Sequence, residues 1–465
     1  MNRGKHNLIY DCYRCHILFG HFELGSYIPT IEEMCGIFQV APQTVRNALL
    51  KLQKDGLVSV SPGRHTIVTY DAPQEEKLRY TQRYYLARRD AIRDVYGISS
   101  AVLMPLFHEG CQRLSEEACQ RMLKSIRNRG TDFAALSIIC CGNILHALNN
   151  PLANSLLGDM IGFFQFPYVP WFDEMQDPLY LENHQLLVSS CESLDREGIF
   201  KAFVYLQKMT QDTLQIFIRK ADEVLETPTQ IPFQWHLYRA RSQQCYSLAA
   251  AIVHKIIDGE YPENTLIPSY ESVVKETALS KNTARRAAAI LQDLGGLRSI
   301  NGVGNQICFS EPNWKELQKP VMEKNISMAL QSLEILSLTA GEVIGHAFEL
   351  ITERQEEDVQ AILRKNANAV HGLGLVVSLM EHLTTRTLPF ASEVYDKLFE
   401  FLLLAYPLFI YHNGQQENIS QYVIGLEQSL RTRDAEQFSA QLLELLDVPA
   451  WSSALCASLR HEGGS

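Results

Sequence analysis

Apolar residues recur at every third or fourth position in the N-terminal part of the chain, a spacing that predicts amphipathic helices. Residues 5–20 are expected to form the first helix, which Gly20 ends. Thr30 is followed three residues later by Glu33, which is the pattern of a capping box at the start of a second helix. Pro42 suits the first position of a third helix, because a proline there loses no helical hydrogen bond.

Gly56 is expected to end the third helix, and the pattern then changes to that of β-strands. Residues 57–60 and 66–70 have strand character, and the segment 61–64 between them contains proline and glycine, which predicts a β-hairpin. Three short helices followed by a hairpin predict a winged helix-turn-helix domain. We assign residues 1–72 to this domain and call it the first head.

The same pattern occurs again 239 positions later, without a gap. Ser280 is expected to cap the third helix of this copy, and residues 301–305 to turn its hairpin. A repeat of this length indicates a duplicated domain rather than a solenoid. Residues 233–311 are therefore expected to form a second winged helix-turn-helix domain, the second head. Identical residues stand at Ile17/Ile256, Gly20/Gly259, Ile28/Ile267, Pro29/Pro268, Glu32/Glu271, Thr44/Thr283, Arg46/Arg285, Ala48/Ala287, Leu52/Leu291, Gln53/Gln292, Gly56/Gly295 and Gly63/Gly302.

The stretches that follow the heads, residues 73–228 and 312–460, have helical apolar spacing, and each is expected to form an all-helical domain. Proline and polar residues at 71–74 and 227–232 predict exposed connections. The fold class is thus expected to be mainly α, with two heads, each followed by a helical domain, and an internal duplication. Two local similarities indicate that the helical domains are duplicated too: 116–123 with 356–363, and 150–155 with 388–393.

The composition is that of an ordinary soluble globular chain, with 46% hydrophobic and 20% charged residues. The net charge of −11 excludes a polybasic coat protein, so any nucleic-acid binding must use local positive patches. The eleven cysteines are scattered, and no apolar signal region follows the first residues, which predicts the reducing cytoplasm. The longest apolar run, near 399–411, is too short to span a bilayer and contains Pro407, so no membrane association is expected and a buried helix end is predicted.

The repeated residues carry a resemblance to a known family. In both copies a glycine precedes Ile-Pro-[Ser/Thr], and Thr-x-Arg, a glycine and a glycine-led wing follow. This series, over residues 17–70 and 248–309, resembles the GntR family of bacterial transcription regulators. The resemblance implies DNA-reading heads joined to domains for effector binding, oligomerisation or both. Helical sensors occur in the family's fatty-acid- and organic-acid-responsive branch, but that branch's metal motif is not found here.

A helix of this kind reads DNA with its N-terminal turn in the major groove, where hydroxyls and amides bind phosphates and arginine binds guanine. The resemblance therefore implies DNA contacts from both third helices and from both wings. In the first head these residues are Gln43, Thr44, Arg46, Asn47, Gly63 and Arg64, with His65 beside them. In the second head they are Ser280, Lys281, Asn282, Thr283, Arg285, Arg286, Gly302 and Gly304, with Asn305 beside them.

The two heads depart from the family pattern to different degrees. Glu32 and Glu271 stand where the family usually has an arginine after the Ile-Pro-[Ser/Thr] motif. Before Thr-x-Arg the family usually has Ser-Arg, and the first head has Ala41-Pro42 instead, whereas the second keeps Ser280 and substitutes Lys281. The second head is therefore expected to bind DNA better than the first. The formal charge is +2 for residues 1–70 (7 basic minus 5 acidic) and +2 for 237–310 (8 minus 6).

The leading hypothesis is a transcription regulator whose partners are a double-stranded DNA operator, with a small-molecule effector and a homodimer left open. The alternative is an interaction or scaffold protein whose winged helices no longer read DNA. In that case Arg46 would pair with Glu32, and Arg285 with Glu271, as ordinary surface ion pairs. The sequence contains no Ser/His/Asp set, phosphate loop or paired carboxylates at useful spacing, so no enzyme is expected.

Metal binding is not expected either. Cys12 and Cys15, with His16, lie on a predicted helix, and no second Cys/His pair follows at zinc-finger spacing. His108, His146 and His184 in the first helical domain are isolated along the chain, where ordinary surface or core roles are commoner than metal ligation. No cofactor is predicted.

Overall fold

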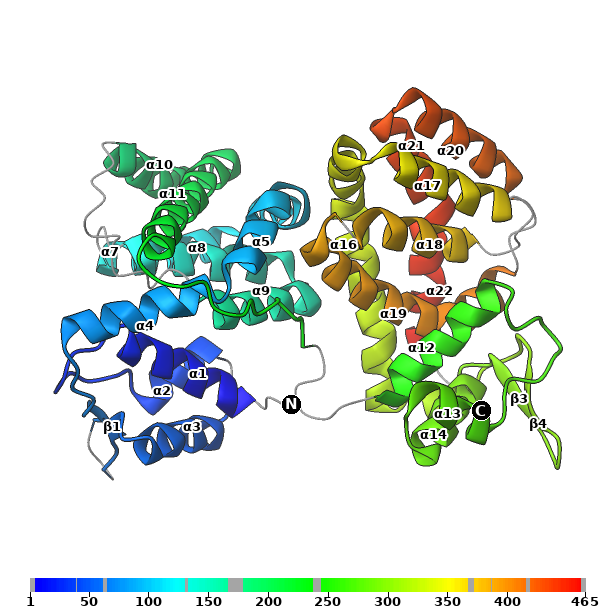
Figure 1. Ribbon diagram of the computed structural model, residues 1–465, viewed down its shortest axis with the longest axis horizontal. Helices are drawn as coiled ribbons and strands as arrows, with labels where there is room; N and C mark the ends of the chain where they lie inside the picture. Colours follow the sequence, from blue (N-terminus) through cyan, green and yellow to red (C-terminus); the bar gives the residue numbers. More distant parts are fainter. Residues whose placement is uncertain are drawn as a thin grey trace. The chain divides into compact units, whose positions relative to one another are not determined.

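The computed structural model describes residues 5–38, 40–61, 65–129, 133–165, 179–236, 244–366, 372–385, 387–414 and 419–460. The fold is mainly helical, as expected, and includes two short β-hairpins (Figure 1). The chain divides into two compact units, residues 1–97 with 106–242 and residues 98–105 with 243–465. Each unit contains three helices with a β-hairpin, and further helices that follow them.

The first head has the predicted element order. Its elements are α1 (Lys5–Leu18), α2 (Ile31–Phe38), α3 (Pro42–Lys54), β1 (Val58–Ser59) and β2 (Ile67–Val68). Apolar side chains from all three helices and both strands form one core, which includes Ile17, Met34, Val45 and Val68. The predicted capping box is present, because Glu33 Oε2 accepts from the Thr30 amide at 2.7 Å and the Glu33 amide donates to Thr30 Oγ1 at 3.2 Å. The strands are shorter than predicted, since only two residue pairs are in register.

Eight helices follow the first head among the described residues up to 236, and all of them except residues 98–105 belong to the first unit. They are α4 (Gln74–Leu86), α5 (Arg89–Val102), α6 (Met104–Gln112), α7 (Glu116–Arg129), α8 (Phe133–Leu148), α9 (Pro151–Phe164), α10 (Leu179–Ser193) and α11 (Arg196–Asp222). The long helix α11 packs against α4, α8 and α10, and its buried stripe includes Phe203 and Phe217. Helix α1 of the head contacts α4 and α9, so the head is seated on the helical domain of its own unit.

The segment after α11 is partly held in place rather than simply exposed. Residues 227–232 are exposed or half-buried, as expected, but the Ile231 amide donates to the Ala87 carbonyl at 2.7 Å. Beyond them Phe233 and Trp235 are buried, and Phe233 stacks on Phe164 with ring centroids 6.1 Å apart. Burial of two aromatic side chains anchors this segment to the first unit.

The second unit begins with the same element order. Its elements are α12 (Gln244–Ile257), α13 (Tyr270–Thr277), α14 (Lys281–Asp293), β3 (Leu297–Ile300) and β4 (Gly304–Ile307). Each of these three helices begins and ends 239 positions after its counterpart in the first head. The hairpin register matches as well, because Val58 pairs with Val68 and Leu297 pairs with Ile307. The predicted turn at 301–305 is shorter in the structure, since β4 already begins at Gly304.

Eight further helices follow in the described part of the second unit. They are α15 (Trp314–Leu317), α16 (Pro320–Leu350), α17 (Glu353–Lys365), α18 (Gly372–Thr384), α19 (Pro389–Asn413), α20 (Ser420–Thr432), α21 (Ala435–Leu446) and α22 (Val448–Arg460). Helix α16 packs against α19, α21 and α22, and α12 of the head packs on α19. Trp451 stacks on Phe409 with centroids 4.4 Å apart, and Pro407 is buried within α19. The apolar run near 399–411 is therefore a buried part of a helix, as predicted.

One segment, Ala435–Arg460, is long and apolar enough to cross a membrane if length and composition alone are considered. In the structure Asp447 has φ of 50° and divides this segment into α21 and α22. Both helices pack against α16, with Leu445 and Trp451 buried. Core helices of folded domains have the same apolar composition.

Candidate nucleic-acid interface

The N-terminal turn of α3 presents the residues predicted for the first head. Pro42 occupies the first helical position as expected, and the preceding Ala41 makes no side-chain cap. The Gln43 side-chain amide donates to Asn47 Oδ1 at 3.0 Å, one turn further on. Gln43 and Asn47 are exposed and Thr44 is half-buried, so their polar groups face outward at the helix end.

Arg46 is exposed, while its neighbours Val45 and Ala48 are buried in the head. Among the described residues Arg46 makes no ion pair. Glu32, which would be its partner if the head did not read DNA, is exposed and makes no ion pair there either. Glu33, the other acidic residue at the start of α2, accepts hydrogen bonds from the amide and the hydroxyl of Thr30 in the capping box. The guanidinium of Arg46 is thus accessible to a phosphate or a base edge.

Helix α14 begins with a complete cap, as the sequence predicted. The Thr283 amide donates to Ser280 Oγ at 3.0 Å, and the two hydroxyl oxygens lie 2.8 Å apart. Lys281 and Asn282 are exposed on the first turn. The remaining backbone N–H groups of this turn and the helix dipole favour an anion at this position.

The ion pair in the second head differs from the alternative considered above. Glu271 of α13 pairs with Lys281, the first residue of α14, and not with Arg285. Both side chains are more than half exposed, at 54% for Lys281 and 61% for Glu271. The hydrogen bond from Lys281 lowers the pKa of the Glu271 carboxyl, so this carboxylate is ionised at neutral pH.

Arg285 and Arg286 are exposed, and neither makes an ion pair within the described part of the chain. Lys255 of α12 pairs with Glu276 at the end of α13, at 2.5 Å, and with Glu260 at 3.0 Å. Two adjacent guanidinium groups remain available on its outer face.

The wings agree only in part with the predictions. Gly302 is exposed at the turn with φ of 73°, a conformation that glycine adopts at little cost, and Gly304 lies in β4. Asn305 is a wrong prediction, because it is 8% exposed and bonded to Gln292 and Tyr270, which holds the wing against the helices. Gly63 and Arg64 lie outside the described residues. His65, next to them, is exposed and packs on Tyr27.

Two exposed wing residues of the second head were not predicted from the sequence. Arg298 extends from β3 and donates to Gln306 Oε1 at 2.8 Å across the hairpin, and Val303 is 60% exposed at the tip. A cation on a wing strand can contact a phosphate, and an apolar tip can enter a minor groove. Arg298 follows Gly295-Gly296 by two residues, and this position at the start of the hairpin could have suggested a wing cation. The outward direction of its side chain, however, depends on the strand register.

The possible metal ligands are in ordinary environments. Cys12, Cys15 and His16 are buried on α1, and Cys12 Sγ lies 3.7 Å from His16 Nε2. Burial raises the pKa of both thiols, to about 11 for Cys15, and lowers the pKa of His16. His108 lies 3.2 Å from Glu197, and the described residues contain no group of three or more side chains that could hold a metal ion.

Comparison with known proteins places the first head in a family. Residues 7–68 match the family described as bacterial regulatory proteins, gntR family. These residues therefore form a GntR-family helix-turn-helix domain with the winged architecture described above. Regulators of this family bind DNA operators and are generally not enzymes.

Solved structures also show similarity, although it is weak. E. coli McbR/YncC has 16% identity, a TM-score of 0.22, and a match covering 47% of this chain and 98% of that protein. Streptococcus agalactiae GntR has 18% identity, a TM-score of 0.22, and a match covering 44% of this chain and 98% of that protein. No curated protein matches the chain.

Proposed function

We propose that the protein is a sequence-specific, DNA-binding transcription regulator with two GntR-like heads in one chain. The observation that carries this function is the equivalence of Arg46 and Arg285. Each is exposed one turn into the third helix of its head, and neither is paired with an acidic residue in the described structure. Arginine at this position is suited to bidentate contact with guanine O6 and N7.

Matching backbone hydrogen bonds support a duplicated head. The Ile28 amide donates to the Thr66 carbonyl at 3.2 Å, and 239 positions later the Ile267 amide donates to the Asn305 carbonyl at 2.9 Å. Gly56 and Gly295, which end the third helices, have φ of 75° and 82°. Equal helix bounds, strand register and turn conformations are expected when one ancestral domain has been copied.

The helical domains support the same view. In the first unit α7 packs on α8 and α10, and in the second α17 packs on α18 and α20. Pro151 and Pro389 are both the first residue of the next long helix. At one point the alignment of helix starts differs from the sequence similarity of 116–123 with 356–363. Glu116 is the first residue of α7, whereas Glu356 is the fourth residue of α17.

The two heads are expected to be unequal. The third helix of the second head, α14, has a side-chain cap and carries three cations in its first two turns, Lys281, Arg285 and Arg286. The third helix of the first head, α3, has no side-chain cap and carries one cation there, Arg46. We call these two helices the recognition helices. We therefore assign the stronger DNA contact to α14. Because the heads are covalently linked, binding of one raises the effective concentration of the other wherever the geometry permits.

The proposed domains are the heads, 1–72 and 233–311, and the helical domains, 73–228 and 312–460, with one correction at the start of the second head. Phe233 and Trp235 are buried in the first unit, so the elements of the second head begin with α12 at Gln244. The helical domains are proposed to bind an effector, to form a homodimer, or both, since ligand sites form between packed helices. The proposed location is the cytoplasm, where operator DNA is found.

A gel-shift series over the DNA upstream of the protein's own gene tests this function. Replacing Arg285 and Arg286 together by alanine should abolish the specific shift, with each base contact worth about 1–3 kcal/mol. The matched control is Arg364→Ala with Lys365→Ala, an adjacent pair of exposed cations on α17. An unchanged shift in the first double variant would reject the assigned contact.

The alternative is an interaction protein whose winged helices no longer read DNA. The exposed Glu32, the Glu271–Lys281 ion pair and the net charge of −11 favour this alternative. It predicts that any DNA affinity is weak and independent of DNA sequence. Titration with specific and scrambled DNA at several salt concentrations separates the two functions.

A further inference from the structure

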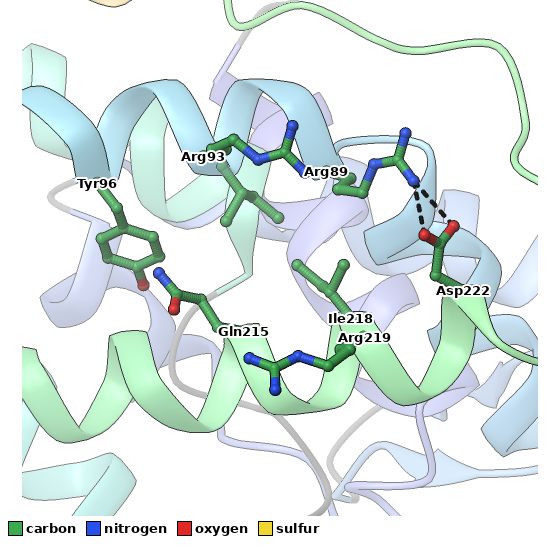
Figure 2. Close-up of a pocket in the computed structure, with 8 residues that line it drawn as sticks. Arg89, Arg93, Tyr96, Gln215, Ile218, Arg219 and Asp222 are labelled. Atoms are coloured by element: carbon green, nitrogen blue, oxygen red, sulfur yellow. Dashed lines mark hydrogen bonds and ion pairs between the residues drawn. The ribbon is translucent and has the colours of Figure 1, made fainter.

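A cavity of about 320 Å³, half open to solvent, lies between α5 and α11 in the first helical domain (Figure 2). Residues at positions i, i+4 and i+7 of each helix face it, namely Arg89, Arg93 and Tyr96 of α5, and Gln215, Arg219 and Asp222 of α11. Ile92 and Ile218 form an apolar part of the lining. The volume is at the small end of ligand pockets, which span roughly 300–1,000 Å³.

The cavity has more positive than negative charge. Three arginines line it, and Asp222 is the one acidic residue among the lining residues. Arg89 Nη1 contacts both carboxylate oxygens of Asp222, at 2.8 and 2.9 Å. Asp90, outside the lining, lies 3.3 Å from Arg89 Nε and 3.8 Å from Arg93 Nη1. Even with Asp90 counted, one positive charge remains, and Arg219 makes no ion pair in the described structure.

The neutral polar groups also suit an oxyanion. Gln215 and Tyr96 also line the cavity, and Figure 2 draws both toward the end opposite the Arg89–Asp222 pair. Burial raises the pKa of the Tyr96 hydroxyl, so this group is neutral at physiological pH. Guanidinium and amide donors around an apolar patch match an anion that carries a short hydrocarbon part.

Asp222 also connects this cavity to the segment that leads to the second head. Thr227 Oγ1 donates to Asp222 Oδ1 at 3.0 Å. Three residues later, Gln230 Oε1 accepts from the Asp90 amide at 3.1 Å and Gln230 Nε2 donates to the Leu86 carbonyl at 2.9 Å. An anion that took over Arg89 would leave the Asp222 carboxylate without its partner, so the contacts of residues 223–231 would change with occupancy.

We infer that the cavity between α5 and α11 is a binding site for a small carboxylate or phosphate anion, and that the anion displaces Asp222 from Arg89. Displacement loosens the hydrogen bond that Thr227 donates to the Asp222 carboxylate. The site thereby gives the proposed regulator an effector whose binding reaches the segment before the second head. This last link rests on the proposed function, whereas the binding of the anion does not.

Isothermal titration calorimetry of the full-length protein tests the site, with inorganic phosphate and succinate as separate probes at constant ionic strength. At least one probe should bind saturably, and the probe that binds distinguishes phosphate from carboxylate ligands. Replacing Arg93 and Arg219 by glutamine should weaken binding at least about tenfold, since hydrogen bonds to charged groups are worth roughly 1.5–3 kcal/mol each. The matched control is Arg121→Gln with Lys124→Gln, two exposed cations on α7.

Asp222→Asn gives a result of opposite sign, because it removes the competing carboxylate. Anion binding to this variant should be several-fold tighter, which a merely structural role of Asp222 would not produce. Absence of saturable binding for both probes, or equal affinity in the Arg93/Arg219 variant and its control, would overturn the site.

Hydrogen exchange of the full-length protein tests the connection to residues 223–231. The bound probe should speed exchange of the Ile231 amide, which donates to the Ala87 carbonyl at 2.7 Å, and Thr227→Val should do the same without a probe. Saturable binding with unchanged exchange would refute the displacement of Asp222. Neither measurement involves DNA, so failure of the site and failure of DNA binding are separately visible.

Discussion

Glu271 and Lys281 form an ion pair that joins the start of α13 to the first residue of α14. The pair places a carboxylate beside the N-terminal turn proposed to meet DNA phosphates. It has two opposing effects, since it orders Lys281 but also adds a negative charge where phosphates must approach. Because both side chains are more than half exposed, the pair contributes little to folding stability.

Replacing Glu271 by glutamine should strengthen DNA binding by the full-length protein. The variant removes repulsion and makes Lys281 available to a phosphate, so the slope of log K against log[salt] should steepen by about 0.9 for one added contact. Fluorescence anisotropy at several salt concentrations measures this slope. Glu353→Gln on α17, an exposed first-turn glutamate far along the chain, is the control. Weaker binding would mean that the pair positions Lys281 for contact.

Substitutions at the N-cap positions of the two recognition helices, Ser280 and Ala41, should change the free energy of unfolding in opposite directions. Ser280→Ala removes the side chain that accepts from the Thr283 amide, which should cost about 1 kcal/mol of unfolding free energy. Ala41→Ser offers α3 the cap it lacks and should stabilise the first head by a similar amount. Urea unfolding followed by circular dichroism measures both. A stabilising Ser280→Ala would contradict the role of this cap.

The two glycines that end the recognition helices should tolerate alanine unequally. Both have positive φ, which costs an alanine roughly 1–2 kcal/mol. A Cβ on Gly56 meets nothing within 4 Å, whereas a Cβ on Gly295 would lie 2.3 Å from the Ser310 carbonyl oxygen. Gly295→Ala should therefore be clearly more destabilising in thermal unfolding than Gly56→Ala. Equal losses would show that the backbone at Ser310 moves at little cost.

The buried His16 should make stability depend on pH. Burial, with a smaller contribution from the charge of His21, lowers the pKa of His16 below its usual 6.5 in the folded state. The unfolded chain therefore binds a proton first, so this contribution is complete above about pH 6.5 and is lost as pH falls, by up to about 1.4 kcal/mol per pH unit. His16→Gln should flatten the stability profile below pH 6.5, whereas His21→Gln, at an exposed position, should not.

Much of the two heads could be predicted from the sequence because the determining interactions are local. The capping box of Thr30 and Glu33, the cap of Ser280 and the proline start of α3 each involve residues at most three positions apart. Local spacing fixes such elements whatever the rest of the chain does. The recurrence of the pattern after 239 residues likewise requires no tertiary information.

The residues that the sequence misplaced depend on contacts between distant elements. Asn305 was expected at a wing tip, but strand register turns it toward Gln292 and Tyr270, where it is bonded and buried. The choice of Lys281 over Arg285 as the partner of Glu271 depends on how α13 crosses α14. Neither relationship has a periodic signature along the chain.

The sequence alone determined the order of elements, the repetition of the head and the identity of the cationic residues on each third helix, since these follow from short-range spacing and from residue types. Only the tertiary structure decided which charges are paired, which polar groups are buried, and that Arg89 contacts Asp222, which lies 133 positions later in the sequence. Electrostatic and hydrogen-bond partners are set by distances of a few ångströms in space. Arg89 of α5 and Asp222 of α11 come within such a distance, and no pattern in the sequence predicts it.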